Sequence, residues 1–459
     1  MNKHRRCAGL LPKIGMLVGC AAFIVATPAL AVPSYSTQTG QACSVCHVGA
    51  FGPQLTPYGR NFKLNGYTQS DGEDHGLPIA LMLQSSFTST QAGQNPPPVS
   101  GFGPNNNFSL DQVSAFYAGS ITSSTGAFIQ TTYDGVNNVL HWDNADVRYA
   151  REGSLLGVDY IAGVTVNNNP TVQDLWNSTP AWGFPYAASA LAPSPAASAL
   201  IDNNLAQIVL GAGAYASLND WLYIEADAYH GLSQNIRNGL GAVPVAGTDD
   251  YNGFIPYWRV ALEHDFNGEH YVEFGTYGLN ASRYPGGDHT TGMTDHFTDN
   301  AVDANYQWHA DPDHIVSLHS TFIHEYEELN ASAALAASNA SNTLNTFRAD
   351  ASYSYQNTWT PSIQYFNTQG SKDQNGWWGT STGNASPDSS GFITELAYVP
   401  FGKPDSPLPW VNGRLALQYV AYTKFDGTST GAANNNTIFL NLWLSLDPVA
   451  AFASKAQTP

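Results

Sequence analysis

The sequence predicts a transmembrane antiparallel β-barrel of about sixteen strands that carries a small N-terminal module, and three observations support this fold class. Charged residues make up only 12% of the 459 residues, which is about half the share of a globular protein. No segment after the first 31 residues approaches the roughly 20 apolar residues of a membrane-spanning helix. From residue 77 onward, apolar and polar residues alternate in segments of roughly ten, as in strands with one face toward lipid and one toward a lumen.

The first 31 residues are expected to form a secretory signal peptide. Four basic residues lie between positions 3 and 13, residues 14–25 are apolar, and residues 29–31 read Ala-Leu-Ala, a typical cleavage site. Residues 17–20 also resemble a lipoprotein cleavage box, although the apolar stretch before Cys20 is short. Either interpretation predicts export.

Charge and cysteine content narrow the range of functions. The chain has 17 Lys and Arg against 36 Asp and Glu, a net charge of −19, and four of the basic residues lie in the signal. Such acidity argues against a nucleic-acid partner. Cleavage removes Cys7 and Cys20, so only Cys43 and Cys46 remain. A disulfide between them would close too small a loop to stabilise a large chain, and we therefore expect them to serve chemistry.

The barrel is expected to occupy residues 77–446, with a tail at 447–459. Connections after even-numbered segments are mostly short and those after odd-numbered segments mostly long, which predicts periplasmic turns, extracellular loops and periplasmic termini in the outer membrane of a Gram-negative bacterium. The sixteen expected strands are 77–88, 108–119, 125–134, 139–150, 155–166, 205–217, 220–231, 253–265, 268–279, 296–308, 312–325, 342–355, 358–369, 391–400, 412–425 and 434–446.

Alternation within these segments assigns each face. In segment 220–231, Leu222 and Ile224 share one face and Glu225 and Asp227 share the other. A soluble β-sandwich also alternates, but its strands are often shorter. The carboxylates are therefore expected to point into the lumen and the aliphatic side chains into lipid.

The N-terminal module, residues 32–76, contains the motif Cys43-Ser44-Val45-Cys46-His47. C-x-x-C-H is the attachment signature of c-type haem. The two thiols add to the porphyrin vinyl groups, and the histidine is the proximal iron ligand. A zinc site would need a second pair of ligands, and a redox C-x-x-C normally lies in a βαβ context. The sequence therefore predicts one covalent haem c on Cys43 and Cys46, with His47 on the iron.

A short helix should follow the motif. Thr56 is a suitable N-cap before Pro57, and Gly66 lies beyond the expected end at Asn65. From this helix and the residues after it, Phe62, Leu64 and Tyr67 would either cover a haem face or make ordinary helix packing. Some 45 residues cannot bury a haem alone. We therefore expect the barrel mouth to shield it and the module to plug the barrel.

The distal iron ligand is left open. Met82 lies in the first barrel segment on the lumen parity, and a His/Met pair would raise the haem potential. His75, near the periplasmic rim, is the rival ligand, and another residue remains an alternative.

Both ends of the chain resemble a known family. The stretches concerned are 33–35, 38–40, the haem motif, 53–67 (Pro-x-Leu-Thr-Pro-x-Gly-Arg-x-Phe-Lys-Leu-x-Gly-Tyr), 409–415, 418–419 and 435–438. They look like the fused outer-membrane monohaem cytochrome c–porins of iron-oxidising bacteria, although only the N-terminal stretch is specific. The resemblance implies oxidation of extracellular Fe(II), an iron oxidoreductase activity, with electrons passed to a periplasmic carrier such as a small cytochrome or copper protein.

Two alternatives to this function remain. In the first alternative the chain is a solute porin with a haem-bearing plug. In the second it is a conduit that runs electrons outward. Charged pairs expected in the lumen, such as Asp146 with Arg148, fit a filled lumen and an open channel equally well.

Overall fold

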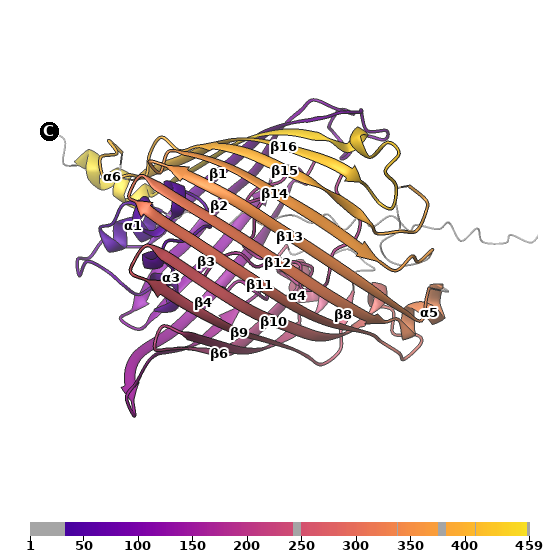
Figure 1. Cartoon of the computed structure of the whole chain (residues 1–459), viewed down its shortest axis with the longest axis horizontal. Coiled ribbons are helices and arrows are strands. Elements are labelled where there is room, and N and C mark those ends of the chain that lie inside the picture. The colour runs from indigo at the N-terminus through magenta and orange to yellow at the C-terminus, as the bar shows by residue number, and fades with distance from the viewer. Residues whose placement is uncertain (1–32, 242–248, 337, 375–381, 409, 457–459) are drawn as a thin grey trace, which may run out of the picture.

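The computed structural model describes residues 33–456 except 242–248, 337, 375–381 and 409. The expected signal peptide lies outside the described residues. Sixteen antiparallel strands form a closed ring in which each pairs with its neighbours in the chain, and the first pairs with the last from Leu81 opposite Leu446 to Thr90 opposite Thr437. Figure 1 shows the strands tilted around a common axis. The predicted fold class and strand number are confirmed.

The strands of the ring correspond closely to the expected segments. They are β1 (Ile79–Thr90), β2 (Asn107–Thr122), β3 (Thr125–Asp134), β4 (Val139–Leu155), β5 (Val158–Asn167), β6 (Val209–Leu218), β7 (Leu222–Gly231), β9 (Phe254–Phe266), β10 (His270–Tyr284), β11 (Asp295–Asp311), β12 (His314–Glu328), β13 (Ser341–Tyr355), β14 (Trp359–Gly370), β15 (Ser389–Tyr398), β16 (Val411–Lys424) and β17 (Thr437–Leu446). A two-residue strand, β8 (Asp250–Tyr251), pairs with the end of β10 outside this ring.

Side chains alternate between the two faces as the sequence predicts. In β7, Ile224 is 40% exposed on the outer face, whereas Glu225 is 5% exposed inside. The outer face of β17 presents Ile438, Leu440, Leu442 and Leu444 in the same way. A closed barrel with an apolar outer face satisfies every strand edge and buries its aliphatic belt in lipid. The protein is an outer-membrane, porin-like β-barrel.

The two ends of the barrel differ in their connections. At the end that carries the N-terminal module most connections are short turns, as at Asn219–Asp220 and Asn267–Gly268, and the connection 399–410 is a longer exception. Gly268 adopts a positive φ of 74°, which glycine permits at little cost. The long connections lie at the opposite end. By the rule for bacterial barrels, the end with short turns faces the periplasm.

Several short helices are not part of the barrel wall. They are α1 (Pro33–Thr39), α2 (Cys43–Cys46), η1 (Val48–Ala50), α3 (Pro57–Leu64), α4 (Gln234–Gly239), η2 (Pro285–Gly287), α5 (Asn330–Ala336), η3 (Ala432–Asn435) and α6 (Pro448–Ala456). Among the described residues, none of the helices is long and apolar enough to cross a membrane.

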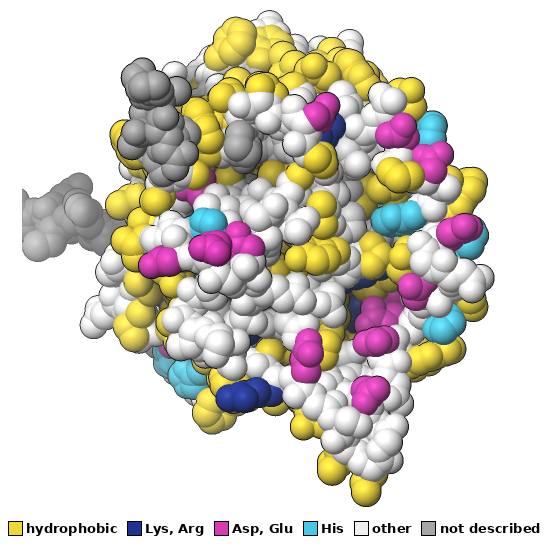
Figure 2. Space-filling view, turned by 90° about the vertical axis from the view of Figure 1, so that its left-hand side faces the viewer, with side chains coloured by type: hydrophobic (Ala, Val, Ile, Leu, Met, Phe, Trp, Pro, Cys, Tyr) yellow, Lys and Arg dark blue, Asp and Glu magenta, His cyan; other side chains and the backbone are white. Residues whose placement is uncertain are grey.

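Residues 33–76, here called the plug, fill the periplasmic mouth. Their contacts reach around the wall: Ser34 Oγ donates to the Ala118 carbonyl of β2 at 2.8 Å, and the Asn412 side chain of β16 donates to the Ala50 carbonyl at 2.7 Å. Tyr67 Oη donates to Asp146 of β4 at 2.7 Å. Figure 2 looks onto this end and shows side chains and backbone filling the mouth. The module therefore lies within the barrel end.

Residues 168–208, here called the inner loop, connect β5 to β6 inside the lumen. The sequence predicts a long connection at 167–204 on the extracellular side; the connection does leave and re-enter the wall at that end, but it folds into the lumen, which was not predicted. The loop crosses from one wall to the other: the Ile201 backbone N–H donates to Asp299 of β11 at 2.7 Å, and Gln364 of β14 donates to the Phe184 carbonyl at 2.6 Å. Lumen side chains thus form hydrogen bonds with its backbone polar groups, and these bonds allow the loop to be buried.

The tail after β17 is also tied to the plug. Asp447 accepts a hydrogen bond from Thr37 Oγ1 at 2.6 Å and also caps the first turn of α6 through the Val449 and Ala450 backbone N–H groups. One carboxylate therefore joins the plug to the segment that follows the last strand.

Candidate functional site

The haem motif forms the short helix α2 and the residue after it. His47 N–H donates to the Cys43 carbonyl at 2.9 Å, and His47 then turns into an extended conformation with φ −120°. A β-bridge to Leu55 holds it there. This arrangement places both thiols and the imidazole on one short, folded segment.

Helix α3 packs directly against this segment. Thr56 caps the helix by accepting from the Gly59 N–H at 3.2 Å, as predicted, and its own N–H donates to the Cys46 carbonyl at 3.0 Å. A Cβ at Gly59 would lie 2.2 Å from the Cys46 carbonyl oxygen, so only glycine allows this approach. The spacing between motif and helix is therefore set by backbone contact.

His47 has the state expected of a metal ligand. The residue is half-buried, and its Nδ1 atom is shielded and has no hydrogen-bond partner in the described chain. Burial lowers the pKa of His47 to about 4. The imidazole is therefore neutral at physiological pH, which is the form that binds iron.

The two cysteines are free thiols in apolar surroundings. Cys43 is 8% exposed and Cys46 is half-buried. Burial raises the pKa of Cys43, and it raises the pKa of Cys46 to about 12. Redox-active C-x-x-C motifs and zinc sites depend on stabilised thiolates instead. The described residues also include no cluster of three or more His, Cys, Asp or Glu side chains that would hold a metal ion.

A cavity of about 70 Å³ lies beside the motif, between the plug and the inner loop. Its lining combines plug residues with one wall residue and two loop residues: Tyr35, Cys46, His47, Pro53, Leu55, Gly59, Phe62, Lys63, Tyr67, Phe128, Asn177 and Trp182. The aromatic rings contact one another, with Tyr35 and Phe62 at 5.0 Å and Phe128 and Trp182 at 5.9 Å between centroids.

The residues fit a c-type haem by their chemistry. Two thiols two residues apart, a half-buried imidazole with an unpartnered nitrogen and a largely apolar aromatic lining suit covalent attachment and proximal ligation. The cavity is smaller than a porphyrin plate, so rings at its edge must rotate to admit one. Two of these rings come from different segments, Tyr35 from α1 and Trp182 from the inner loop, and each is held by a hydrogen bond, Tyr35 Oη to the Ala127 carbonyl at 3.0 Å and Trp182 Nε1 to the Val172 carbonyl at 2.7 Å.

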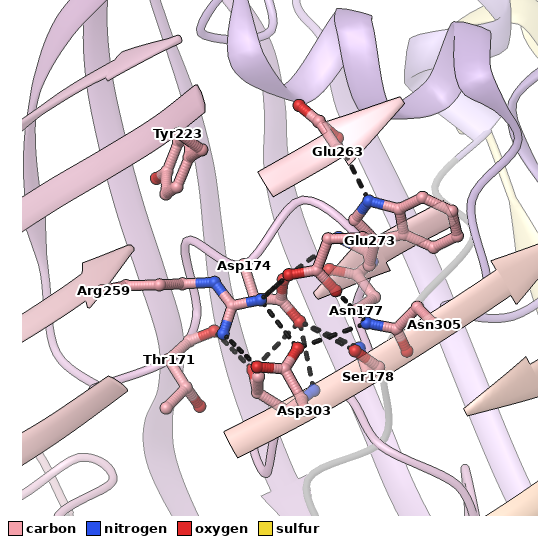
Figure 3. Close-up of polar contacts among 12 residues, drawn as sticks. Thr171, Asp174, Asn177, Ser178, Tyr223, Arg259, Glu263, Glu273, Asp303 and Asn305 are labelled. Atoms are coloured by element: carbon pink, nitrogen blue, oxygen red, sulfur yellow. Dashed lines mark hydrogen bonds and ion pairs between the residues drawn. The ribbon is translucent and has the colours of Figure 1, made fainter. Parts of the chain in front are cut away.

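The inner loop is fixed beside the cavity by one buried carboxylate. Asp174 Oδ2 accepts from the backbone N–H groups of Ser178 and Thr179 at 2.9 and 3.1 Å, and its Oδ1 lies 3.5 Å from Arg259 of β9. Burial opposes ionisation of this carboxylate, but Arg259, Lys63 and these N–H groups hold its pKa below the ordinary value. Figure 3 shows Asp174 turned toward Arg259.

Arg259 joins that loop to the barrel wall. Its guanidinium lies 2.7 Å from Glu273 of β10 and 2.8 Å from Asp303 of β11, and it is fully enclosed (Figure 3). Trp176, from the same loop turn, donates its indole N–H to Glu263 at 3.1 Å. Loop and wall are therefore held by charge-assisted hydrogen bonds in a site shielded from water.

Lys63 and Asn177 connect the loop to the plug. Lys63 Nζ donates to the Asp174 carbonyl and to Asn177 Oδ1, both at 2.6 Å. Asn177 also donates to the Pro53 carbonyl of the plug at 2.7 Å. Burial and the nearby charge of Arg148 lower the pKa of Lys63 to about 7, against the opposing influence of Asp174.

Only some of the residues that the sequence predicts to cover or ligate the haem lie at the cavity. Phe62 and Tyr67 line the cavity, but Leu64 does not and packs instead in a separate cluster with Trp176. Met82 is 3% exposed and belongs to the same apolar cluster as Phe62 and Trp182, without lining the cavity. His75 lies on the exposed periplasmic rim, 2.9 Å from Asp71, and is not brought to the cavity.

Sequence reasoning missed the site residues that lie far from the motif. Phe128, Asn177 and Trp182 line the cavity beside His47 although they follow it by 81 or more positions. Phe128 could have been predicted to point into the lumen, because its place in the alternating segment 125–134 puts it on the lumen face. No sequence signal marks Asn177 or Trp182, because an irregular loop has no periodicity that reveals where it folds.

The comparisons with known proteins concern only the barrel. No family model and no curated protein matches the chain. Solved structures that resemble it include an anion-selective porin from Comamonas acidovorans, with 10% identity, a TM-score of 0.46 and coverage of 81% of this chain and 99% of that one. The outer membrane channel DcaP of Acinetobacter baumannii (12%, 0.42, 80% and 96%) and the in-vitro folded OmpT of Vibrio cholerae (8%, 0.39, 82% and 98%) are also similar.

Proposed function

We propose that this barrel carries one covalent haem c in its periplasmic mouth and conducts electrons across the outer membrane. The observation that carries the proposal is the half-buried His47, whose Nδ1 atom has no hydrogen-bond partner in the described chain, next to Cys46 in a largely apolar cavity that the plug and the inner loop close together. When bound, the haem would supply one-electron redox chemistry. No protein acid, base or nucleophile is then required.

The chain's own residues would bind and shield the group. Cys43 and Cys46 would hold it through thioether bonds, and His47 would ligate its iron from the proximal side. Phe62, Tyr67 and Trp182 would exclude water from its faces, which favours a stable potential. The distal ligand stays open: Met82 belongs to the apolar cluster next to the cavity without lining it, His75 would have to leave Asp71 to serve, and another residue remains an alternative.

The donor and acceptor are proposed on separate grounds. Extracellular Fe(II) as the donor rests on the family resemblance of the N-terminal motif. A basic periplasmic carrier, such as a small cytochrome or copper protein, suits the charge of the plug end, where Figure 2 shows many acidic and few basic side chains. The exposed carboxylates there include Asp71, Glu73, Asp74, Glu152, Asp159, Asp220, Asp265, Glu269, Asp311, Asp313 and Asp405. Such a field steers cationic partners.

Visible spectroscopy of the detergent-solubilised protein tests the proposal. We expect c-type haem bands, a haem-stained band on denaturing gels, and rapid reduction on addition of Fe(II). The Cys43→Ala/Cys46→Ala double variant should lose the stain and still show the heat-shifted mobility of a folded barrel. Wild-type protein without covalent haem would refute the proposal, and haem that Fe(II) fails to reduce would refute its iron-oxidising part.

A solute porin with a haem-bearing plug is the second candidate, and one observation favours it. A cavity of about 230 Å³ lies between the inner loop and the wall from β12 to β17, with polar side chains such as Gln364, Asn367 and Gln418 along it. The three similar structures named above are porins, channels or outer membrane proteins by description. Solute flux through reconstituted wild-type protein, at a rate comparable to that of open porins, would favour this function over electron transfer.

A conduit that runs electrons outward is the third. Time-resolved spectra with a periplasmic-side reductant in sealed vesicles would distinguish it, since haem oxidation would then depend on an acceptor outside.

A further inference from the structure

Lumen-facing arginines of the barrel wall are each matched with a carboxylate. Within the described chain, five lumen-facing arginines on five strands have an Asp or Glu oxygen within the ion-pair limit of 4.0 Å: Arg148, Arg259, Arg283, Arg348 and Arg414. Pairing of this kind is expected, because an isolated charge in a water-poor interior carries a large desolvation cost.

Lys63 of the plug departs from this pattern. It is 5% exposed, and no carboxylate oxygen of the described residues lies within 4.0 Å of its Nζ atom. Its two acceptors are neutral, the Asp174 carbonyl and the Asn177 side-chain oxygen, which leaves one of the three N–H donors of an ammonium group. The nearby Asp174 carboxylate is directed to Arg259 and to backbone N–H groups instead.

The position of Lys63 shows which cavity its amine borders. It lies on α3 next to Phe62 and lines the same cavity as His47 and Cys46. Its Nζ atom also lies 5.4 Å from the centre of the Trp182 ring, on the loop side of that cavity. A buried amine without a carboxylate partner in the described chain thus borders the space beside the haem motif.

We propose that Lys63 is the anchor for a carboxylate of the haem, pairing with one of the two propionates of the porphyrin. This inference rests on the proposed function, because it requires haem on Cys43 and Cys46. The ammonium group would gain the anion that the described chain does not provide, and the propionate would gain a partner away from water. Asn177 would hold Lys63 in place through the bond it already makes.

The test compares Lys63→Met with wild type by redox titration of the purified protein. Loss of the positive charge leaves the propionate uncompensated and disfavours the more negative, reduced haem. We expect reduction to become about tenfold less favourable, ~59 mV for one electron, with covalent haem still present. Lys63→Arg should retain most of the wild-type potential, because it keeps the charge.

Lys403→Met is the matched control. It removes the same charge at the same end of the barrel, from a half-buried lysine that donates to Thr358 and Val399 and does not line the cavity. It should leave the potential unchanged. If Lys63→Met does not assemble, Lys63→Gln keeps a donor for the Asp174 carbonyl and serves in its place.

Three results would overturn the inference. An unchanged potential in both uncharged Lys63 variants would refute the pairing while leaving the haem assignment intact. A low-spin to high-spin change in the visible spectrum would show that Lys63 ligates iron rather than a propionate. A wild-type protein without haem stain would refute the proposed function and this inference together.

Discussion

The plug and the inner loop fill the same lumen but are fixed in different ways. The plug is short and is held by hydrogen bonds of both its backbone and its side chains, such as that from Asn412 to the Ala50 carbonyl and that from Ser34 Oγ to the Ala118 carbonyl. The inner loop is irregular and is held by buried charges of the wall, above all Arg259 acting on Asp174. The plug therefore carries the reactive motif, whereas the loop supplies the cover that the motif lacks. A site of this kind is complete only when both segments are in place.

Deleting the segments separately and together is the strongest way to break this comparison. Both obstruct the lumen, so removing residues 33–76 or residues 178–198 alone should raise planar-bilayer conductance only in part. Removing both should bring it near that of an open sixteen-stranded pore, whose lumen is wide enough for water. If the plug deletion alone gives full conductance, the inner loop does not obstruct the passage.

Arg259→Met tests the charged attachment of the loop. The substitution leaves Asp174, Glu273 and Asp303 buried with no cation between them. Removing one partner of a buried ion pair costs ~3–5 kcal/mol, and we expect that loss in the unfolding free energy in detergent. Arg151→Met removes an exposed arginine at the end of β4 and should change stability by less than ~0.5 kcal/mol. Equal stability of both variants would contradict the role given to Arg259.

Tyr67→Phe tests the plug by one of its side-chain contacts. The change removes the 2.7 Å hydrogen bond to Asp146 in a buried setting, at a cost of ~1–3 kcal/mol. The plug should then become more sensitive to added protease while the barrel keeps its heat-shifted mobility. Tyr58→Phe, at an exposed position of α3, should leave the protease pattern unchanged.

Thr56→Ala should have the smallest effect. It removes the N-cap of α3, which typically costs about 1 kcal/mol, while Thr56→Ser retains the capping oxygen. Local hydrogen exchange of residues 57–64 should rise in the alanine variant only. Exchange that rises equally in both would show that methyl packing, rather than the cap, matters at this position.

The contrast between the segments also explains what the sequence can predict. Strand positions followed from the alternation of side chains, because the lumen and lipid faces impose a period of two; Glu225 and Ile224 are on the faces expected of them. The cap of α3 followed from local chemistry at Thr56. Strands β4 and β10 each end about five residues later than the sequence predicts. Strand pairing continues past the apolar belt, where the pattern of apolar and polar residues no longer marks a strand.

The candidate site was predictable only on the plug side. The thiols and His47 were evident from their spacing, whereas Lys63 drew no attention because an isolated lysine in a sequence shows neither its burial nor its lack of a counter-ion. The inward fold of the inner loop was not predicted for a related reason. Its anchors are single side chains on distant strands, such as Asp299 and Gln364, and no local pattern links them to the residues they hold.

The position of the cysteines bears on the order of events in biogenesis. Cys43 is only 8% exposed, and Cys46 is half-buried in the plug at the periplasmic mouth. The ring closes through β1 and β17, which are the most distant strands in the chain and so should pair late. An enzyme that attaches the proposed haem has free access to both thiols before the plug docks in the closed ring, and restricted access to Cys43 afterwards. We therefore expect the proposed attachment to precede docking of the plug.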